Sequence, residues 1–210
     1  MKKKLHIIGC GEICDEITYY WRADEPDREI TNIDPEALAD FLQNDKLLLR
    51  QDAFFVALDN DLLNLKRLGF INQLVQEGLK VETFVSRLAV VPPDLKLGFN
   101  SYVGPNVIIE PSCRFSFNTF IGVHSHIGSH STLQHSVWLG KRVTVGQKVN
   151  IGNHTVLTDN ITIKREVNIG AFTCIEKQMV VHENIAEKTF ILEGFQSPLH
   201  IIKFSEPSAA

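Results

Sequence analysis

The sequence lacks a strong excess of either charge. Its 21 Lys and Arg residues nearly balance 25 Asp and Glu residues, so the formal net charge is −4 and the pI is about 6.1. A protein with this balance has no electrostatic footprint for nucleic acid or for an anionic membrane surface. We therefore expect no nucleic-acid partner, and any phosphate group of a ligand has to be held by a few local lysines and arginines.

Long hydrophobic runs are also missing. No segment approaches the roughly 20 consecutive apolar residues that span a bilayer. The basic start of the chain leads after a short apolar run to Glu12, Asp15 and Glu16 rather than to the core of a signal peptide. We expect a cytoplasmic protein without membrane insertion. The four cysteines have no zinc-ribbon spacing, so we expect reduced thiols and no metal site.

What the sequence does have is an uninterrupted period of six. Every sixth position from Val91 to Val181 is apolar, sixteen positions in all, and eight are followed directly by glycine, which tolerates the positive φ of a tight corner. A second small or β-branched residue usually lies two positions earlier, and Cys113 and Cys174 are assigned to inward positions. Each hexad predicts a short strand and a turn, wound into a parallel β solenoid whose rungs stack about 4.8 Å apart.

Residues 4–85 have a different pattern, in which short apolar strands alternate with helices. The sequence predicts strands at residues 5–8, 30–33, 54–58 and 81–85, and helices at residues 12–22 and around Leu62, Leu65, Leu68, Ile71 and Val75. This order is typical of a small parallel sheet. We therefore divide the chain into a Rossmann-like α/β domain at residues 1–85, an all-β helix at 86–186 and a C-terminal tail at 187–210.

A ligand of the small sheet is expected at the carboxyl ends of its strands. The pair Gly9-x-Gly11 lies there, but the third glycine of a dinucleotide-binding fingerprint is missing and the chain is too short for two mononucleotide halves. The alternatives are a tight turn that needs small residues and a site for part of a nucleotide-linked sugar. Candidate contacts of the sugar nucleotide are Gly9, Gly11, Glu12, Asp34 and Asn60.

Several hexads, such as Thr-Phe-Ile-Gly at residues 119–122 and Val-Trp-Leu-Gly at residues 137–140, resemble the repeat of the left-handed β-helix acyltransferases. Together with the α/β domain and the ending at residues 179–198, they resemble the sialic acid O-acetyltransferase and bacillosamine N-acetyltransferase family over nearly the whole chain. This resemblance implies a left-handed parallel β-helix with three hexads per coil and a homotrimer. It also implies transfer of an acetyl or similar acyl group from acetyl-CoA to an amino or hydroxyl group of a nucleotide-linked sugar, as in polysaccharide biosynthesis.

Histidines are concentrated in one part of the repeat. Five fall within 31 residues, and none occupies an inward position, so all are expected to face outward: His124, His126, His130, His135 and His154. On coils of about 18 residues, His135, Ser136, Asn153 and His154 cluster on two adjacent rungs. An imidazole pKa near 6.5 suits proton abstraction from an acceptor amine or hydroxyl at neutral pH.

The resemblance assigns roles within this cluster. The segment around His135 matches the family segment that carries the catalytic histidine, which implies His135 as the general base. Ser136 stands where the family often has an acidic residue that orients the base. Either the base is weaker here, or a carboxylate comes from another subunit or from Glu12 or Asp15 of the α/β domain. The backbone N–H of Asn153, where the family commonly has glycine, is implied as the donor to the thioester carbonyl.

Contacts to CoA are expected near this cluster and along the C-terminal coils. The candidates are Asn153, His154, Lys164, Arg165, Lys188, Ser197 and Pro198. The alternative for the basic residues is a solvated face, which charge runs usually are.

Two other functions remain open. One is a non-catalytic sugar-binding or scaffold protein, because Ser136, Asn153, Asp59 and Asp61 all depart from the family pattern and the two carboxylates would repel a nucleotide phosphate. The other is a zinc hydrolyase of the γ-carbonic anhydrase type, in which histidines across a subunit interface bind zinc. Thiol release from acetyl-CoA distinguishes the acyltransferase from the scaffold, and metal analysis identifies the zinc enzyme.

Overall fold

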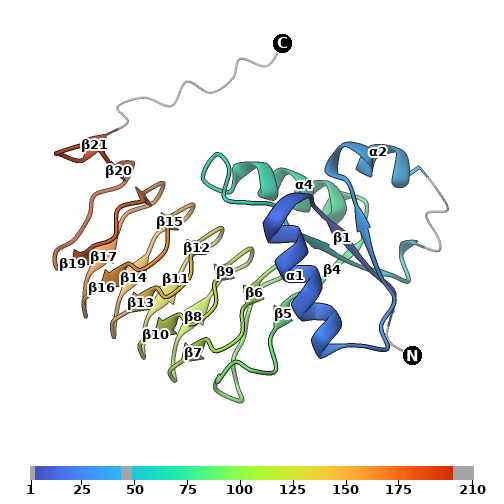
Figure 1. Cartoon of the computed structure of the whole chain (residues 1–210), viewed down its shortest axis with the longest axis horizontal. Coiled ribbons are helices and arrows are strands. Elements are labelled where there is room, and N and C mark those ends of the chain that lie inside the picture. Colours follow the sequence, from blue (N-terminus) through green and yellow to red (C-terminus); the bar gives the residue numbers. More distant parts are fainter. Residues whose placement is uncertain (1–2, 44–48, 201–210) are drawn as a thin grey trace, which may run out of the picture.

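The computed structural model describes residues 3–43 and 49–200. An α/β domain stands at one end of the molecule, and a stack of short strands extends away from it toward the C-terminal part of the chain (Figure 1). This is the order of folds that the sequence predicts. No helix in the described part of the chain is long and apolar enough to cross a membrane.

The α/β domain is built on a four-stranded parallel sheet with the strand order β2-β1-β3-β4. Its elements are β1 (Leu5–Ile8), α1 (Gly11–Asp24), β2 (Ile30–Ile33), η1 (Pro35–Ala37), α2 (Leu38–Phe41), β3 (Ala53–Val56), α4 (Leu65–Gln76) and β4 (Lys80–Val81). Every residue of the central strands β1 and β3 is buried, because both faces of the sheet are covered. Helix α1 packs on one face through Cys14, Ile17 and Trp21, and α2 and α4 pack on the other.

Two elements of this domain differ from the prediction. The expected strand at residues 81–85 is divided, because β4 ends at Val81 and β5 (Phe84–Val85) pairs with the first coil of the solenoid. The helix expected around Leu62 begins only at Leu65. Residues 62–64 instead adopt three successive left-handed conformations, with φ of 50°, 53° and 66°. Such conformations cost about 1–2 kcal/mol each in residues other than glycine.

The solenoid consists of two-residue strands joined by four-residue corners. After β5 they are β6 (Tyr102–Val103), β7 (Ile108–Ile109), β8 (Arg114–Phe115), β9 (Phe120–Ile121), β10 (His126–Ile127), β11 (Thr132–Leu133), β12 (Trp138–Leu139), β13 (Thr144–Val145), β14 (Asn150–Ile151), β15 (Val156–Leu157), β16 (Thr162–Ile163), β17 (Asn168–Ile169), β18 (Cys174–Ile175) and β19 (Val180–Val181). Two further strands, β20 (Thr189–Ile191) and β21 (Leu199–His200), follow at the C-terminal end.

These strands stack into three sheets: β7-β10-β13-β16-β19, β8-β11-β14-β17, and β5-β6-β9-β12-β15-β18-β20-β21. All neighbours are parallel except β20 and β21. Each strand from β6 to β19 pairs with the strand 18 residues away, as Trp138 does with Phe120 and Val156. One coil therefore contains three hexads, as predicted, and the inward apolar residues form a single hydrophobic core inside the coils.

The glycines at the corners have a different role from the predicted one. Within the described residues, none of the glycines that follow the inward apolar positions has a positive φ. The left-handed residue of each corner comes two positions after the glycine position, as at Ser136 and His154. A Cβ atom on Gly122 would lie only 2.6 Å from the carbonyl oxygen of Gly140 in the next coil. At such a corner, glycine therefore serves the close approach of the next coil rather than a positive φ.

The α/β domain docks on the outer face of the eight-stranded sheet through a ladder of aromatic rings. Phe84, Tyr102, Phe120 and Trp138 occupy the same outward position in successive coils, with neighbouring ring centroids 5.4, 4.8 and 3.7 Å apart. They share a hydrophobic cluster with α1. Cys174 belongs to this outward column and not, as predicted, to the interior, because it occupies the first position of its two-residue strand.

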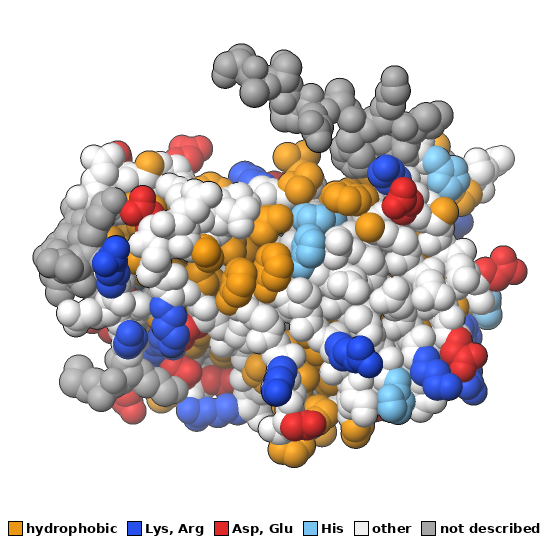
Figure 2. All heavy atoms as spheres, turned by 180° about the vertical axis from the view of Figure 1, so that it is seen from behind, with side chains coloured by type: hydrophobic (Ala, Val, Ile, Leu, Met, Phe, Trp, Pro, Cys, Tyr) orange, Lys and Arg blue, Asp and Glu red, His pale blue; other side chains and the backbone are white. Residues whose placement is uncertain are grey.

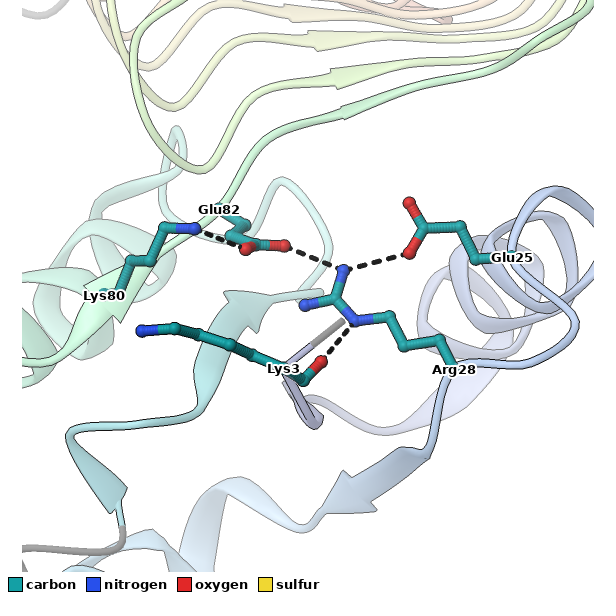
Figure 3. Close-up of polar contacts among 5 residues, drawn as sticks. All are labelled: Lys3, Glu25, Arg28, Lys80 and Glu82. Carbon is teal, nitrogen blue, oxygen red and sulfur yellow. Dashed lines mark hydrogen bonds and ion pairs between the residues drawn. The ribbon is translucent and has the colours of Figure 1, made fainter. Parts of the chain in front are cut away.

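A buried arginine ties the α/β domain to the connection that leads into the solenoid (Figure 3). The Arg28 guanidinium lies 3.1 Å from a carboxylate oxygen of Glu25 and 2.8 Å from one of Glu82, and its Nε donates to the carbonyl oxygen of Lys3. Lys80 pairs with the other oxygen of Glu82. Burial raises the pKa of Glu82, but the hydrogen bonds from Lys80 and Arg28 outweigh it and hold that pKa below its ordinary value of 4.5.

We expect Glu82→Gln to lower the free energy of unfolding at pH 7 by about 1–3 kcal/mol, because it removes two charge-assisted hydrogen bonds. The folded-state pKa of Glu82 is depressed, so its contribution is present above pH 4.5 and is lost as the pH falls through the folded-state value. The difference in the free energy of unfolding between wild type and variant therefore becomes smaller in acid.

Urea denaturation at several pH values measures this difference. Glu29→Gln, which breaks an exposed pair with Lys4, serves as the control and should change stability by less than about 1 kcal/mol. A difference that does not depend on pH contradicts this account.

Candidate active site

The candidate site lies on the edge of the solenoid where the β8-β11-β14-β17 sheet meets the eight-stranded sheet. His135 and Ser136 form the corner between β11 and β12, and Asn153 and His154 form the corresponding corner one coil later. The backbone N–H of His154 donates to the carbonyl oxygen of His135, 3.1 Å away. All four residues therefore lie on adjacent rungs. On the face shown in Figure 2, histidine side chains border a hydrophobic patch.

Aromatic rings flank His135 along this edge. Phe117 from the preceding coil stacks on the His135 ring with centroids 5.1 Å apart and planes only 8° from parallel, and Phe99 stacks on Phe117. On the other side, the His154 ring meets His135 edge-on at 5.0 Å and stacks on Phe172. The half-buried position lowers the pKa of His135 below its ordinary 6.5. The neutral form of the ring therefore predominates at pH 7.

His154 points outward from the coil, as predicted, but residues 62–64 cover it. Its side chain is 4% exposed, and its Nδ1 lies 2.9 Å from the carbonyl oxygen of Leu63. A carbonyl only accepts hydrogen bonds, so the proton is on Nδ1. Burial lowers the pKa of His154, although the bond to Leu63 opposes that change. His154 therefore holds the loop from the α/β domain and does not lie open to a CoA molecule, which changes the role expected for it.

The loop makes a second contact with the same edge. Asn64 is fully buried, and its side-chain amide donates to the carbonyl oxygen of Ser136 over 2.8 Å. Leu62, two positions earlier, is 75% exposed. Leu63 and Asn64 are thus held by His154 and Ser136, which offsets the cost of the left-handed conformations in this segment.

A buried arginine that the sequence analysis did not single out lies behind Ser136. Arg67 of α4 is 3% exposed, and its Nε donates to Oδ1 of Asn118 over 2.7 Å. Burial lowers the pKa of Arg67 to about 9 although Asp59 raises it. The available signal was helical spacing, because Arg67 shares one buried face of α4 with Ile71 and Leu74.

Ser136 and Asn118 link this arginine to the candidate base. Asn118 and Ser136 are both fully buried and occupy the same left-handed position in successive coils. The Asn118 amide donates to Oγ of Ser136 over 2.9 Å, and that oxygen lies 3.5 Å from Nδ1 of His135. Among the described residues, no Asp or Glu hydrogen bonds to His135; neither Glu12 nor Asp15 fills that role within the chain.

Asn153 presents free polar groups next to His135. Its carbonyl oxygen accepts from the N–H of Phe172, but within the described residues its own N–H donates to no other group and its Oδ1 is buried without a partner. A backbone N–H without a partner, one rung from an imidazole, is available to donate to an oxyanion that forms between them.

The residues expected to bind CoA lie on different edges of the solenoid. Lys188 continues the edge of His135, because its N–H bonds to the carbonyl oxygen of Ala171, and it has the left-handed φ of that column. Lys164 and Arg165 lie in the corner after β16, which is a neighbouring edge, and Arg165 pairs with Glu166. Ser197 and Pro198 are exposed just before β21. One chain therefore brings Lys188 to the site but not Lys164 or Arg165.

The residues expected to contact the sugar nucleotide gather where β1, β2 and β3 end. A Cβ atom on Gly9 would lie 2.2 Å from the carbonyl oxygen of Ala57, so Gly9 serves the close approach of two chain segments. Gly11 opens α1 with φ of 77°, and Glu12 in its first turn is exposed. Asp34 accepts from the N–H of Glu36, and Asn60 donates its own N–H to Asp59.

No three His, Cys, Asp or Glu side chains in the described part of the chain are placed to hold a metal ion together. A hollow of about 410 Å³ lies elsewhere, between α1 and β2, and is lined by Asp15, Thr18, Tyr19, Arg22, Ala23 and Asn32.

Known proteins share this fold. A family model described as GMPPB C-terminal domain matches residues 79–191, which is more than half of the chain. The acetyltransferase domain of PglB from Neisseria gonorrhoeae, solved with acetyl coenzyme A, is 16% identical, with 90% of this chain and 96% of that chain covered and a TM-score of 0.80. No curated protein matches the sequence.

Two further solved structures are similar over most of their length. Perosamine N-acetyltransferase from Caulobacter crescentus, solved as a mutant with one histidine replaced by asparagine and with CoA and GDP-perosamine bound, is 20% identical, with coverage of 89% and 92% and a TM-score of 0.72. WeeI from Acinetobacter baumannii is 13% identical, with coverage of 94% and 100% and a TM-score of 0.67. These likenesses confirm the predicted fold: a small α/β domain followed by a left-handed parallel β-helix.

Proposed function

The chain belongs to the family described as the GMPPB C-terminal domain, and we propose that it is an acyl-CoA-dependent acyltransferase acting on a nucleotide-linked sugar. The observation that carries this proposal is the placement of His135 and the free N–H of Asn153 on adjacent rungs of one edge. The solved structures with acetyl coenzyme A, or with CoA and GDP-perosamine, support the donor and the class of acceptor.

In this reaction His135 takes the proton that the acceptor amine or hydroxyl loses as it attacks the thioester carbonyl. The N–H of Asn153 stabilises the negative charge that develops on the carbonyl oxygen. Protonated His135 then returns the proton to the departing thiolate, so that free CoA and the acylated sugar leave. Phe117 stacks on one side of the His135 ring and His154 meets it edge-on, so the ring is held in place but stays partly exposed.

The sugar nucleotide is placed in this proposal at the carboxyl ends of β1, β2 and β3, near Gly11, Asp34 and Asn60, because the loop that begins at Asn60 leads directly to the site. Lys188, on the same edge as His135, is the basic residue placed best for CoA within one chain. We propose a cytoplasmic homotrimer as the working form; Lys164 and Arg165, which lie on a neighbouring edge, would then belong to a site shared with another subunit.

The function is tested by incubating the purified chain with acetyl-CoA and a panel of nucleotide-linked amino sugars and sialic acids. Thiol release coupled to a mass increase of one acetyl group in one of the sugars supports the proposal. Binding of a sugar nucleotide without thiol release supports instead the non-catalytic scaffold, which the absence of a carboxylate beside His135 within the described chain favours.

The pH dependence of the reaction follows from the burial of His135. Because its pKa lies below 6.5 and the neutral ring is the active form, kcat/KM should rise with pH through a midpoint below 6.5 and stay level between pH 7 and 8. Initial rates of thiol release in constant-ionic-strength buffers measure this profile. A midpoint at or above 6.5 would mean that a neighbouring negative charge, absent from the described chain, acts on the base.

A further inference from the structure

We propose that Asn118, oriented by the buried Arg67, sets the tautomer of His135 through Ser136, so that the resting ring carries its proton on Nε2. Arg67, Asn118 and Ser136 form a chain of hydrogen bonds that ends at Nδ1 of His135. The consequence for catalysis rests on the proposed function, but the tautomer itself does not.

The first step is the orientation of the Asn118 amide. Arg67 has only donors, so Nε and Nη2 must meet acceptors, and they meet Oδ1 and the carbonyl oxygen of Asn118 at 2.7 and 3.3 Å. Asn100 also donates to the same Oδ1. The amide oxygen of Asn118 is therefore fixed toward Arg67, and its NH2 group must face Ser136.

The second step is the direction of the Ser136 hydroxyl. Its oxygen accepts from Asn118 over 2.9 Å, which leaves one lone pair and the hydroxyl hydrogen. The side chain is fully buried, and among the described residues its Oγ has only one other polar neighbour, Nδ1 of His135 at 3.5 Å. A buried hydroxyl hydrogen without an acceptor is costly, so Ser136 donates to Nδ1.

The same count of donors and acceptors disfavours a hydrogen bond in the opposite direction, from His135 to Ser136. If Nδ1 of His135 donated to Ser136, that oxygen would accept twice and its own hydrogen would have no partner among the described residues. The charged and titratable groups nearby agree with this direction. Arg67, at the other end of the hydrogen-bond chain, is cationic, Asp59 acts on Arg67, and His154 donates its own Nδ1 proton to Leu63. None of these groups accepts a proton from Nδ1 of His135.

Nδ1 faces the buried Ser136 hydroxyl, which leaves Nε2 as the nitrogen that can act as the base. A proton already on Nε2 makes this tautomer the wrong one for that role. Before it accepts the proton of the acceptor sugar, the ring has to move its own proton from Nε2 to Nδ1 through solvent while the Ser136 hydroxyl turns away. In serine proteases, loss of the group that selects the correct tautomer lowers kcat by on the order of 10⁴-fold. Asn118 is thus a positioning residue that keeps the base in its less reactive form.

Asn118→Asp tests the proposal, because it is isosteric and reverses the chain. The new carboxylate accepts from Arg67 and from the Ser136 hydroxyl, which frees the Ser136 oxygen to accept from Nδ1–H of His135. In ¹⁵N NMR spectra of the full-length protein labelled at histidine, wild type should show His135 as the Nε2–H tautomer and the variant should show the Nδ1–H tautomer. His154, which donates from Nδ1 to Leu63, is an internal reference of the second kind, and His135→Ala assigns the signal.

The variant should also raise the midpoint of the kcat/KM pH profile and raise kcat at pH 7 by at least about tenfold, since the base no longer has to change tautomer. Ser136→Ala is the second variant, because it removes the donor and should give a mixture of tautomers without adding charge. An Nδ1–H ring in the wild type, or a ring unchanged in both variants, overturns the proposal. If both proteins show the expected tautomers but release no thiol, the hydrogen-bond chain from Arg67 to His135 is supported and the proposed function is overturned.

Discussion

His135→Ala should lower kcat for acyl transfer by about 10²- to 10⁴-fold, the range that general base catalysis contributes. The ring is the neutral imidazole on the edge that carries the free Asn153 N–H, and alanine leaves the acceptor without a group to take its proton. KM for acetyl-CoA should change little, because the ring acts in the transition state rather than in binding. Thiol release under saturating substrates measures the loss.

His124→Ala is the matched control. His124 has the same left-handed corner conformation as Ser136 and His154, but it is exposed on a different edge of the solenoid. It should leave kcat within about twofold of wild type, since an exposed side chain far from the chemistry contributes little. Equal losses in both variants would show a general effect on the fold, and unchanged turnover in His135→Ala would remove that residue from the mechanism.

Gly9→Ala should destabilise the protein by about 3 kcal/mol or more, at the upper end of what overpacking costs. The added Cβ would stand 2.2 Å from the carbonyl oxygen of Ala57 and 3.1 Å from Cβ of Cys14, neither of which can move without shifting backbone. For a chain of this size, such a loss corresponds to a fall in Tm of roughly 6–12 °C. Thermal unfolding followed by circular dichroism measures it.

Gly69→Ala is the control with the opposite sign. Gly69 lies inside α4, and a Cβ there meets no atom within 4 Å. Alanine should stabilise the helix by up to about 1 kcal/mol, because it restricts the unfolded chain and favours the helical conformation. A destabilised Gly69→Ala would mean that α4 does not have the environment described here. If Gly9→Ala is as stable as wild type, the close approach described between Gly9 and Ala57 does not exist in the protein.

The period of six predicted the solenoid well, because a coil that repeats leaves the same mark on the sequence at every turn. The reason given for the glycines was wrong, since a turn needs positive φ and a stacked coil needs space, and both favour glycine. The φ angles of these glycines and the register of Gly122 over Gly140 separate the two explanations. The face on which the α/β domain docks was marked by Phe84, Tyr102, Phe120 and Trp138 at 18-residue spacing, a pattern that depends on knowing the length of the coil.

The candidate site was predictable only in part. The column that unites His135 with Asn153 follows from the repeat alone. Arg67 did not follow from it, because the burial of that cation depends on how α4 docks against Asn118, a contact between residues 51 positions apart in sequence. The shielding of His154 by Leu63 depends on the same docking. A contact between the α/β domain and the solenoid produces no periodic pattern in the sequence of either part.

The left-handed segment at residues 62–64 connects the candidate sugar-nucleotide subsite to the edge that carries His135. The carbonyl oxygen of Asn60, where the sugar nucleotide is proposed to bind, accepts from the N–H of Asn64, and Asn64 and Leu63 hold Ser136 and His154. A ligand that shifts Asn60 therefore works against hydrogen bonds beside the base. Thermodynamic linkage makes this effect reciprocal. If the sugar nucleotide changes the affinity of the base site for its ligand, that ligand changes the affinity for the sugar nucleotide by the same factor.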